Sequence, residues 1–67
     1  MRIVLNGETR ELAEGATVAD AVDASGAQSR SGVAVALDGE VIPQGGWSDQ
    51  PLADGQQVEV LQAVQGG

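Results

Sequence analysis

The sequence ends in Gly66-Gly67, and the carboxylate of Gly67 is its most conspicuous reactive group. The chain contains no His and no Cys, and its three basic side chains are all arginines. A general base near neutrality, a thiolate nucleophile, a Schiff-base lysine and a His-ligated metal site therefore have no residues to form them. We expect no catalytic, metal-binding or cofactor-binding side chains, and a protein that is not itself an enzyme.

Two terminal glycines suit a carboxylate that another protein must enclose. Glycine has no Cβ, so the backbone of a partner can approach it closely. Four extended residues span about 13 Å at about 3.3 Å each, so residues 64–67 can enter a cleft while the rest of the protein docks outside it. We therefore expect one domain over residues 1–63 and a flexible tail over residues 64–67. The alternative is an ordinary frayed terminus without a function.

Turns of the Asn-Gly and Asp-Gly type divide much of the chain into short strands. Both central residues of a type I′ turn need positive φ, so such a pair between extended runs predicts a hairpin. Asn6-Gly7 and Asp38-Gly39 predict hairpins, and Asp54-Gly55 predicts a third turn. Strands are expected at residues 2–5, 9–12, 33–37, 40–42 and 57–63.

One short helix is expected after Thr17, which is followed at the third position by Asp20 in a pattern typical of a capping box. Gly26 suits the position just beyond the helix end, so the helix has roughly eight residues and a length of about 12 Å. The segment 44–54 is expected to be irregular, with Trp47 and Leu52 as its buried anchors.

These elements predict an α+β domain, because one helix this short covers only one face of a sheet. The sheet should be mixed and contain four to five strands, with the first and last strands side by side and parallel. The expected core residues are Ile3, Leu5, Leu12, Val18, Val22, Val33, Val35, Leu37, Ile42, Leu52, Val58 and Val60.

Several motifs occur together and in a fixed order along the chain. They are Asn6-Gly7-Glu8, Gly15-x-Thr17-Val18-x-Asp20, residues 33–43, Trp47, residues 52–55 and the close at residues 58–67. This order resembles the ThiS sulfur-carrier family of thiamine biosynthesis over essentially the whole chain. Gln44 stands where family members often carry a basic residue, and Gly45-Gly46 replaces a commoner polar pair.

The resemblance implies a ubiquitin-like β-grasp fold and a carrier that other enzymes modify. In that family, a ThiF-like adenylyltransferase uses ATP and magnesium to convert the terminal glycine carboxylate to an acyl-adenylate. A sulfur-relay donor protein then leaves a thiocarboxylate, and a ThiG-like thiazole synthase takes that sulfur. Carried over to this chain, Gly67 is the modified residue and Gly66 is the spacer that admits it. ATP and magnesium belong to the partner, so this chain itself binds no cofactor.

The sheet face that the helix leaves uncovered is the expected docking surface. If Ile3 and Leu5 face the helix, the alternation of a strand turns their neighbours outward, and an uncovered apolar face is typical of a partner site. The candidate docking residues are Val4, Leu61, Val64 and Gln65, with Ala34 and Ala36 beside them. The candidates for an acidic rim are Asp49, Asp54 and Glu59. The alternative is that these are isolated exposed residues, which are common and need no function.

Charge narrows the possible partners. Ten acidic residues against three arginines give a net charge of −7, which repels nucleic acid and anionic membrane surfaces and favours a partner with a basic face. The longest apolar run, at residues 33–37, is far shorter than the roughly 20 residues that span a bilayer. With no secretory signal pattern at the start of the sequence, a cytoplasmic location is expected.

Three rival functions stay open, and one of them is a carrier that supplies sulfur for cysteine or another sulfur metabolite. The small subunit of molybdopterin synthase, or another MoaD-like carrier, shares the fold, the Gly-Gly end and the thiocarboxylate, although that family tends to be longer and to carry aromatic residues that this chain lacks. A non-covalent ubiquitin-like docking module belongs to a different class. It would bind through its sheet and never be activated at Gly67.

Overall fold

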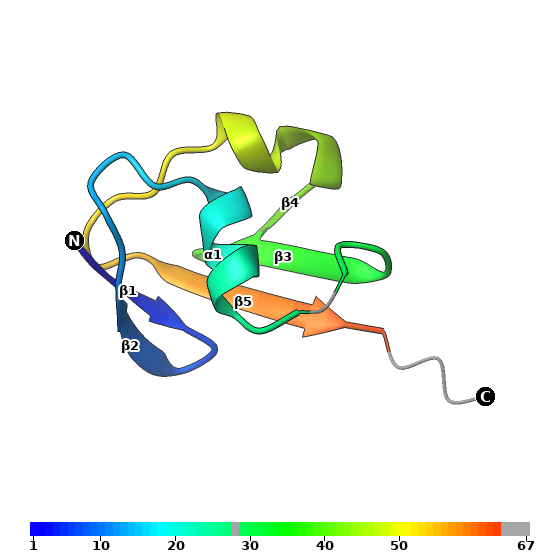
Figure 1. Cartoon of the computed structure of the whole chain (residues 1–67), viewed down its shortest axis with the longest axis horizontal. Coiled ribbons are helices and arrows are strands. Elements are labelled where there is room, and N and C mark those ends of the chain that lie inside the picture. The colour runs from blue at the N-terminus through cyan, green and yellow to red at the C-terminus, as the bar shows by residue number, and fades with distance from the viewer. Residues whose placement is uncertain (28, 64–67) are drawn as a thin grey trace.

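A mixed β-sheet forms the body of the protein (Figure 1). The structure is a computed structural model that describes residues 1–27 and 29–63, and within these residues it contains five strands, one α-helix and one 3-10 helix. The strands are β1 (Arg2–Leu5), β2 (Glu8–Glu11), β3 (Val33–Leu37), β4 (Glu40–Ile42) and β5 (Gln57–Gln62). The helices are α1 (Val18–Ala24) and the 3-10 helix η1 (Gln44–Asp49).

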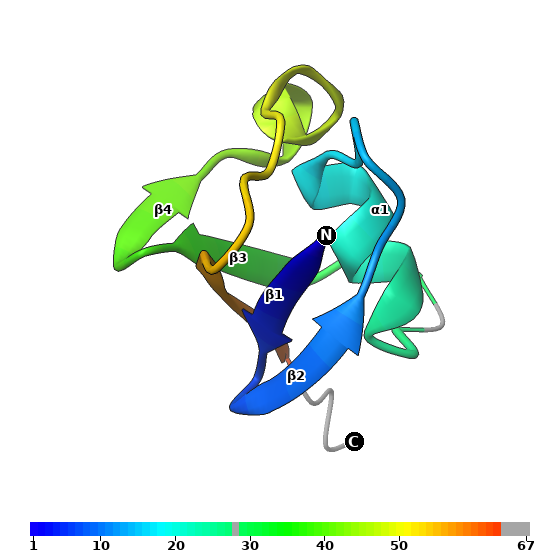
Figure 2. The same cartoon turned by 90° about the vertical axis from the view of Figure 1, so that its left-hand side faces the viewer.

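The sheet has the order β2-β1-β5-β3-β4, which places the first and last strands of the chain side by side at its centre. Strands β1 and β5 are parallel, with Leu5 opposite Val58, and every other neighbouring pair is antiparallel. The sheet curves around α1, which lies on one of its faces (Figure 2). The predicted α+β architecture and the parallel pairing of the outer strands of the sequence are confirmed.

The hairpins predicted at Asn6-Gly7 and Asp38-Gly39 are present, and both turn on residues in the left-handed region. Asn6 has a φ of 50° and Gly7 a φ of 81°, while Asp38 and Gly39 have φ of 49° and 86°. Asparagine and aspartate adopt this region more readily than other non-glycine residues, which explains their place in both turns. Strand β2 begins at Glu8, one residue earlier than the expected 9–12. The reason is that the turn has only two residues, so pairing resumes directly opposite Leu5.

The start and end of α1 agree with the sequence pattern. The backbone N–H of Thr17 donates to Oδ2 of Asp20 at 2.8 Å, which satisfies a donor that the helix itself leaves free. Gly26 follows the helix with a φ of 85°, as expected for the position beyond a helix end. The helix has seven residues, close to the expected eight.

The core lies between the sheet and α1, and most of the expected residues are in it. Leu12, Val33 and Ile42 are only partly buried and pack against its border, because they lie at the ends or edges of the sheet, where fewer elements cover them. Small residues that were not in the expected set help to complete the buried interior. They are Ala16, Ala19 and Ala21.

The segment 44–54 was expected to be irregular throughout. This expectation is wrong for residues 44–49, which form η1. This 3-10 helix packs against α1 and β3. Trp47 anchors it with a side chain that is 1% exposed, and its indole Nε1–H donates to the carbonyl oxygen of Ile42 at 2.9 Å. The predicted anchoring roles of Trp47 and Leu52, which is also buried, are confirmed.

Candidate docking face and the strand that carries the tail

The sheet face opposite α1 carries a row of apolar side chains, which we call the outer face. In β5 the residues alternate, so that Val58 and Val60 are buried while Leu61 is 68% exposed. Pairing places Ala34 directly opposite Leu61 and Val41 opposite Ala36, and residues that pair directly point to the same side of a sheet. The exposed Leu61 and the alanines therefore share one face, as predicted.

Val41 belongs to this outer face and was not among the predicted docking residues. It is 71% exposed, the larger of the two values among the exposed large apolar side chains of the described residues. The alternation within the three-residue strand β4 gives the signal that finds it, because Ile42 points toward the core and its neighbour must point away.

A groove of about 600 Å³ crosses the outer face beside β1 and β5. It is lined by Val4, Asn6, Gly7 and residues 57–61. The groove therefore brings together the two predicted docking residues that the structure describes, Val4 and Leu61, although Val4 is half-buried. An apolar groove with Glu59 in its wall suits a partner that offers apolar and basic side chains.

The predicted acidic rim is wrong at Asp49 and stays a prediction at Asp54 and Glu59. Asp49 lies in η1, which packs on the α1 side of the sheet. Asp54 accepts the backbone N–H of Arg2 at 2.7 Å through Oδ1 and is exposed, so its charge stays at the surface. Glu59 is exposed and pairs opposite Ala36, and it stays a candidate for contact with a basic partner.

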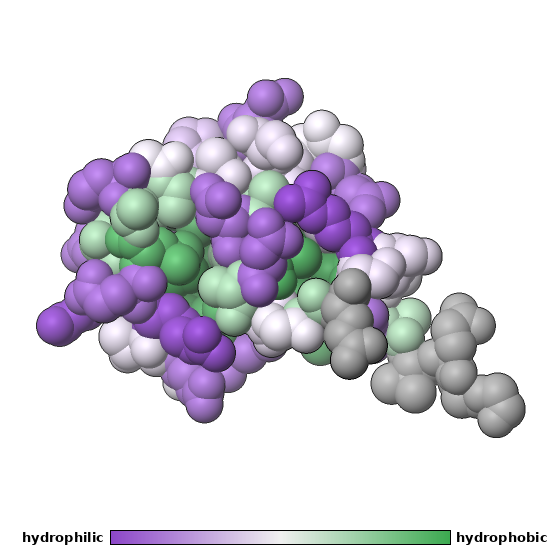
Figure 3. All heavy atoms as spheres, viewed as in Figure 1, coloured by the Kyte–Doolittle hydropathy of each residue, from purple (hydrophilic) through white to green (hydrophobic). Residues whose placement is uncertain are grey.

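Figure 3 is viewed from the side on which α1 lies, opposite the outer face, and on this side hydrophobic residues gather in the middle of the surface and hydrophilic residues surround them. The three arginines of the chain contact oxygens of the chain itself. Arg10 donates to the carbonyl oxygen of Ala24 at 3.3 Å, and Arg30 lies 3.5 Å from Asp23. Because each arginine is used locally and acids outnumber them, the field around the molecule is negative.

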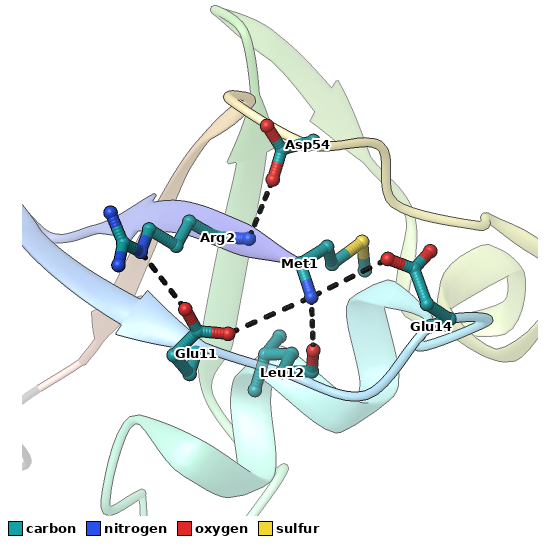
Figure 4. Close-up of polar contacts among 6 residues, drawn as sticks. All are labelled: Met1, Arg2, Glu11, Leu12, Glu14 and Asp54. Atoms are coloured by element: carbon teal, nitrogen blue, oxygen red, sulfur yellow. Dashed lines mark hydrogen bonds and ion pairs between the residues drawn. The ribbon is translucent and has the colours of Figure 1, made fainter.

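The third arginine, Arg2, and the Asp54 contact belong to a polar cluster at the start of β1 (Figure 4). The ammonium group of Met1 donates to the carbonyl oxygen of Leu12 at 2.8 Å. The Arg2 side chain binds Glu11 at 2.9 Å. These contacts tie β1, β2 and the loop before β5 together at the end of the sheet where β5 begins, so they organise the fold rather than the outer face.

The last described residue, Ala63, marks the point from which the tail continues. Its N–H donates to the carbonyl oxygen of Gly32 at 2.8 Å, which extends the pairing of β5 with the chain before β3. The predicted site residues Val64, Gln65, Gly66 and Gly67 lie outside the described residues, so their roles stay predictions, as does the division into residues 1–63 and 64–67.

Residues 1–27 and 29–63 hold no group of three or more acidic side chains placed to bind a metal ion. No helix in the same residues has both the length and the apolar character that crossing a membrane requires.

A curved mixed sheet with its first and last strands parallel at the centre, wrapped around one helix, defines the ubiquitin-like β-grasp class. The crystal structure of the thiamine biosynthesis protein ThiS from Geobacter metallireducens has the same fold, with a TM-score of 0.81, 29% sequence identity and coverage of 100% of both chains. The solution structure of a thiamine biosynthesis protein from that organism gives a TM-score of 0.81 at 30% identity, covering 100% of this chain and 88% of that one.

Sequence comparison reaches the same class of protein. Sulfur carrier protein ThiS of Thermus thermophilus is 43% identical over 63 residues, which cover 94% of this chain and 95% of that protein. Sulfur carrier protein ThiS of Escherichia coli is 28% identical over 67 residues, with 100% of both chains covered. A model of the ThiS family matches residues 3–67. The chain belongs to the ThiS family.

Proposed function

We propose that this protein is a sulfur carrier whose Gly67 carboxylate is adenylated and then converted to a thiocarboxylate that supplies sulfur for thiazole formation. The observation that carries the proposal is the ThiS family match, which extends to residue 67 and so includes the Gly66-Gly67 pair. Curated relatives in the same family are named sulfur carrier proteins. That match favours the thiazole pathway over the molybdopterin alternative.

The proposed chemistry uses the carboxylate and the groups of partner enzymes. A Gly67 carboxylate oxygen attacks the α-phosphorus of ATP, and pyrophosphate leaves to give the acyl-adenylate. A sulfur nucleophile at the oxidation level of sulfide then attacks the carbonyl carbon, and AMP leaves to give the thiocarboxylate. ATP and magnesium are bound by the adenylyltransferase, and this chain supplies the carboxylate and the surface that presents it.

The position of the outer face supports the proposal that this chain presents the carboxylate and the partner enzyme carries out the chemistry. Leu61 and the groove of about 600 Å³ lie on the strand that leads directly to the tail, so a partner docked there meets the tail at its start. Residues 64–67 have a contour length of about 13 Å, enough to reach from the docked domain into a buried active site. Gly66 adds no Cβ beside the reacting carboxylate.

The proposed partners are a ThiF-like adenylyltransferase, a sulfur-relay donor protein and a ThiG-like thiazole synthase. The net charge of −7 supports docking faces that carry basic side chains, because complementary fields speed the encounter of two proteins. Since the reaction consumes ATP, we place it in the cytoplasm as part of the same proposal.

The test is intact-mass spectrometry after incubation with the adenylyltransferase of the same organism, ATP, magnesium and a sulfur donor. The full chain should gain the mass difference between a sulfur and an oxygen atom, and a Gly67 deletion should not. Ser48→Ala is the matched control, because Ser48 is exposed in η1 on the α1 side and should gain sulfur like the wild type. A Gly67 deletion that is adenylated as fast as the full chain would show that the tail proposal is wrong.

A second part of the experiment distinguishes a carrier for thiazole formation from a carrier for molybdopterin synthesis. Thiocarboxylated protein should support thiazole formation by the thiazole synthase of the same organism, whereas transfer only to a molybdopterin precursor would assign it to the other carrier class. Failure of the wild-type chain to be adenylated under any of these conditions would favour a non-covalent docking module.

A further inference from the structure

Strand β5 continues well past the end of its neighbour β1. The last paired position of β1 is Leu5, opposite Val58, and β5 runs on to Gln62. Among the described residues, no strand pairs with β5 beyond Val58 on this side. A strand edge of this kind has backbone donors and acceptors that need other partners.

The side chain of Asn6 supplies these partners at Val60. Its Oδ1 accepts the backbone N–H of Val60 at 2.8 Å, and its Nδ2 donates to the carbonyl oxygen of Val60 at 3.2 Å. The backbone N–H of Asn6 also donates to the carbonyl oxygen of Val58 at 2.9 Å. One residue in the turn after β1 thus makes three hydrogen bonds to β5, and its amide group replaces the peptide of a neighbouring strand.

Position 6 makes two demands that asparagine meets together. Its φ of 50° lies in the left-handed region, which glycine, asparagine and aspartate adopt most readily. Pairing with both groups of Val60 needs a side chain with one acceptor and one donor at this reach. Glycine has no side chain, and an aspartate carboxylate accepts but does not donate.

The hydrogen bonds lie close to the start of the tail. Val60 is three residues from Ala63, the last described residue, and its side chain is 7% exposed in the core. Leu61, which follows on the outer face, and Asn6 line the same groove. Any change in the path of β5 at Val60 therefore moves both the docking residue and the point from which residues 64–67 continue.

We propose that Asn6 is a positioning residue, whose side-chain amide fixes the end of β5 and so sets the direction from which the Gly67 carboxylate is offered to a partner's active site. This inference rests on the function proposed above. Docking through the outer face leaves the reacting carboxylate several residues away, so the positions that the Gly67 carboxylate can reach depend on where β5 ends and in which direction it leads. A misplacement of about 1 Å can lower a rate by about a hundredfold.

The chain contains a matched control for this role. Asp38, in the turn between β3 and β4, has a φ of 49°, and its Oδ1 accepts the N–H of Gln57 at 2.9 Å. It thus makes the same kind of side-chain contact to β5, but at the start of the strand, far from the tail. Asn6→Gly and Asp38→Gly both keep a residue that tolerates positive φ, and they remove two and one side-chain hydrogen bonds to β5, respectively.

The experiment compares wild type, Asn6→Gly, Asn6→Asp and Asp38→Gly at a temperature where all are folded. In Asn6→Gly, hydrogen exchange of the Val60 amide should be about fivefold faster. The kcat of adenylation by the adenylyltransferase of the same organism should fall by about tenfold or more, and by a larger factor than KM rises, because the tail then starts from a displaced strand end while the rest of the outer face keeps its place. Asn6→Asp keeps the acceptor for the Val60 N–H, so its kcat should lie between those of the wild type and Asn6→Gly. Asp38→Gly should keep the wild-type kcat.

A wild-type kcat in Asn6→Gly, or an equal loss in Asp38→Gly, would overturn the inference and leave Asn6 with a purely structural role. Unchanged exchange of the Val60 amide in Asn6→Gly would do the same without any enzyme present. A wild-type chain that is never adenylated would instead overturn the proposed function, and the positioning role with it.

Discussion

Replacement of Leu61 by aspartate tests the outer face as a docking surface. Leu61 is 68% exposed, so the free energy of unfolding should change by less than about 0.5 kcal/mol, as for most surface substitutions. Full burial of a leucine side chain contributes about 1.5–3 kcal/mol, and the exposed two-thirds can contribute about 1–2 kcal/mol on docking. The Kd for the adenylyltransferase should therefore rise about 5-fold to 30-fold.

Isothermal titration calorimetry at fixed salt measures this Kd, and thermal unfolding checks that the variant is folded. Gln62→Glu is the matched control, because it adds the same charge at the next residue but on the α1 side, where Gln62 lines a small cavity with Ser25 and Gly26. An equal rise in Kd for Leu61→Asp and Gln62→Glu would mean that the added negative charge, and not the loss of the leucine side chain, weakens binding. An unchanged Kd in Leu61→Asp would refute the docking role of the outer face.

Two further substitutions test whether the tail determines adenylation and the core determines stability. Gly66→Val should leave the Tm unchanged but sharply lower adenylation measured by intact mass, because a branched side chain obstructs the close approach that glycine permits. A lowered Tm with normal adenylation would reverse that assignment. Trp47→Phe should lower the free energy of unfolding, measured in urea, by about 1–3 kcal/mol, because it leaves the carbonyl oxygen of Ile42 without its donor. A cost near zero would mean that water replaces the indole N–H.

Most of the fold follows from local signals in the sequence. The Asn6-Gly7 and Asp38-Gly39 turns need positive φ, and this fixes the registers of both hairpins. The capping pair at Thr17 sets the start of α1. The 3-10 helix at residues 44–49 was not predicted, because Gly45 and Gly46 disfavour helix and the tertiary packing of Trp47 outweighs that preference.

The docking face was only partly predictable. Alternation along a strand gives Leu61, Val4 and, with Ile42 facing the core, Val41 as outward-facing residues, but which of them lie side by side depends on which strands become neighbours. Asp49 was wrongly placed in the acidic rim, because composition does not show that residues 44–49 form a 3-10 helix that packs on the α1 side. The bonds from Asn6 to Val60 join residues 54 positions apart, and the sequence of the turn shows only its left-handed preference.

Both hairpin turns hold β5 in addition to reversing the chain. Asp38 accepts a backbone N–H at the first residue of β5, and Asn6 pairs with both backbone groups of Val60 near its end. The strand also lies at the centre of the sheet, between β1 and β3. The element that leads to the tail is therefore held by strands on both sides and by two turn side chains. In the function proposed above, the Gly67 carboxylate is offered from this strand, so the contacts that hold β5 would set the place from which the tail starts.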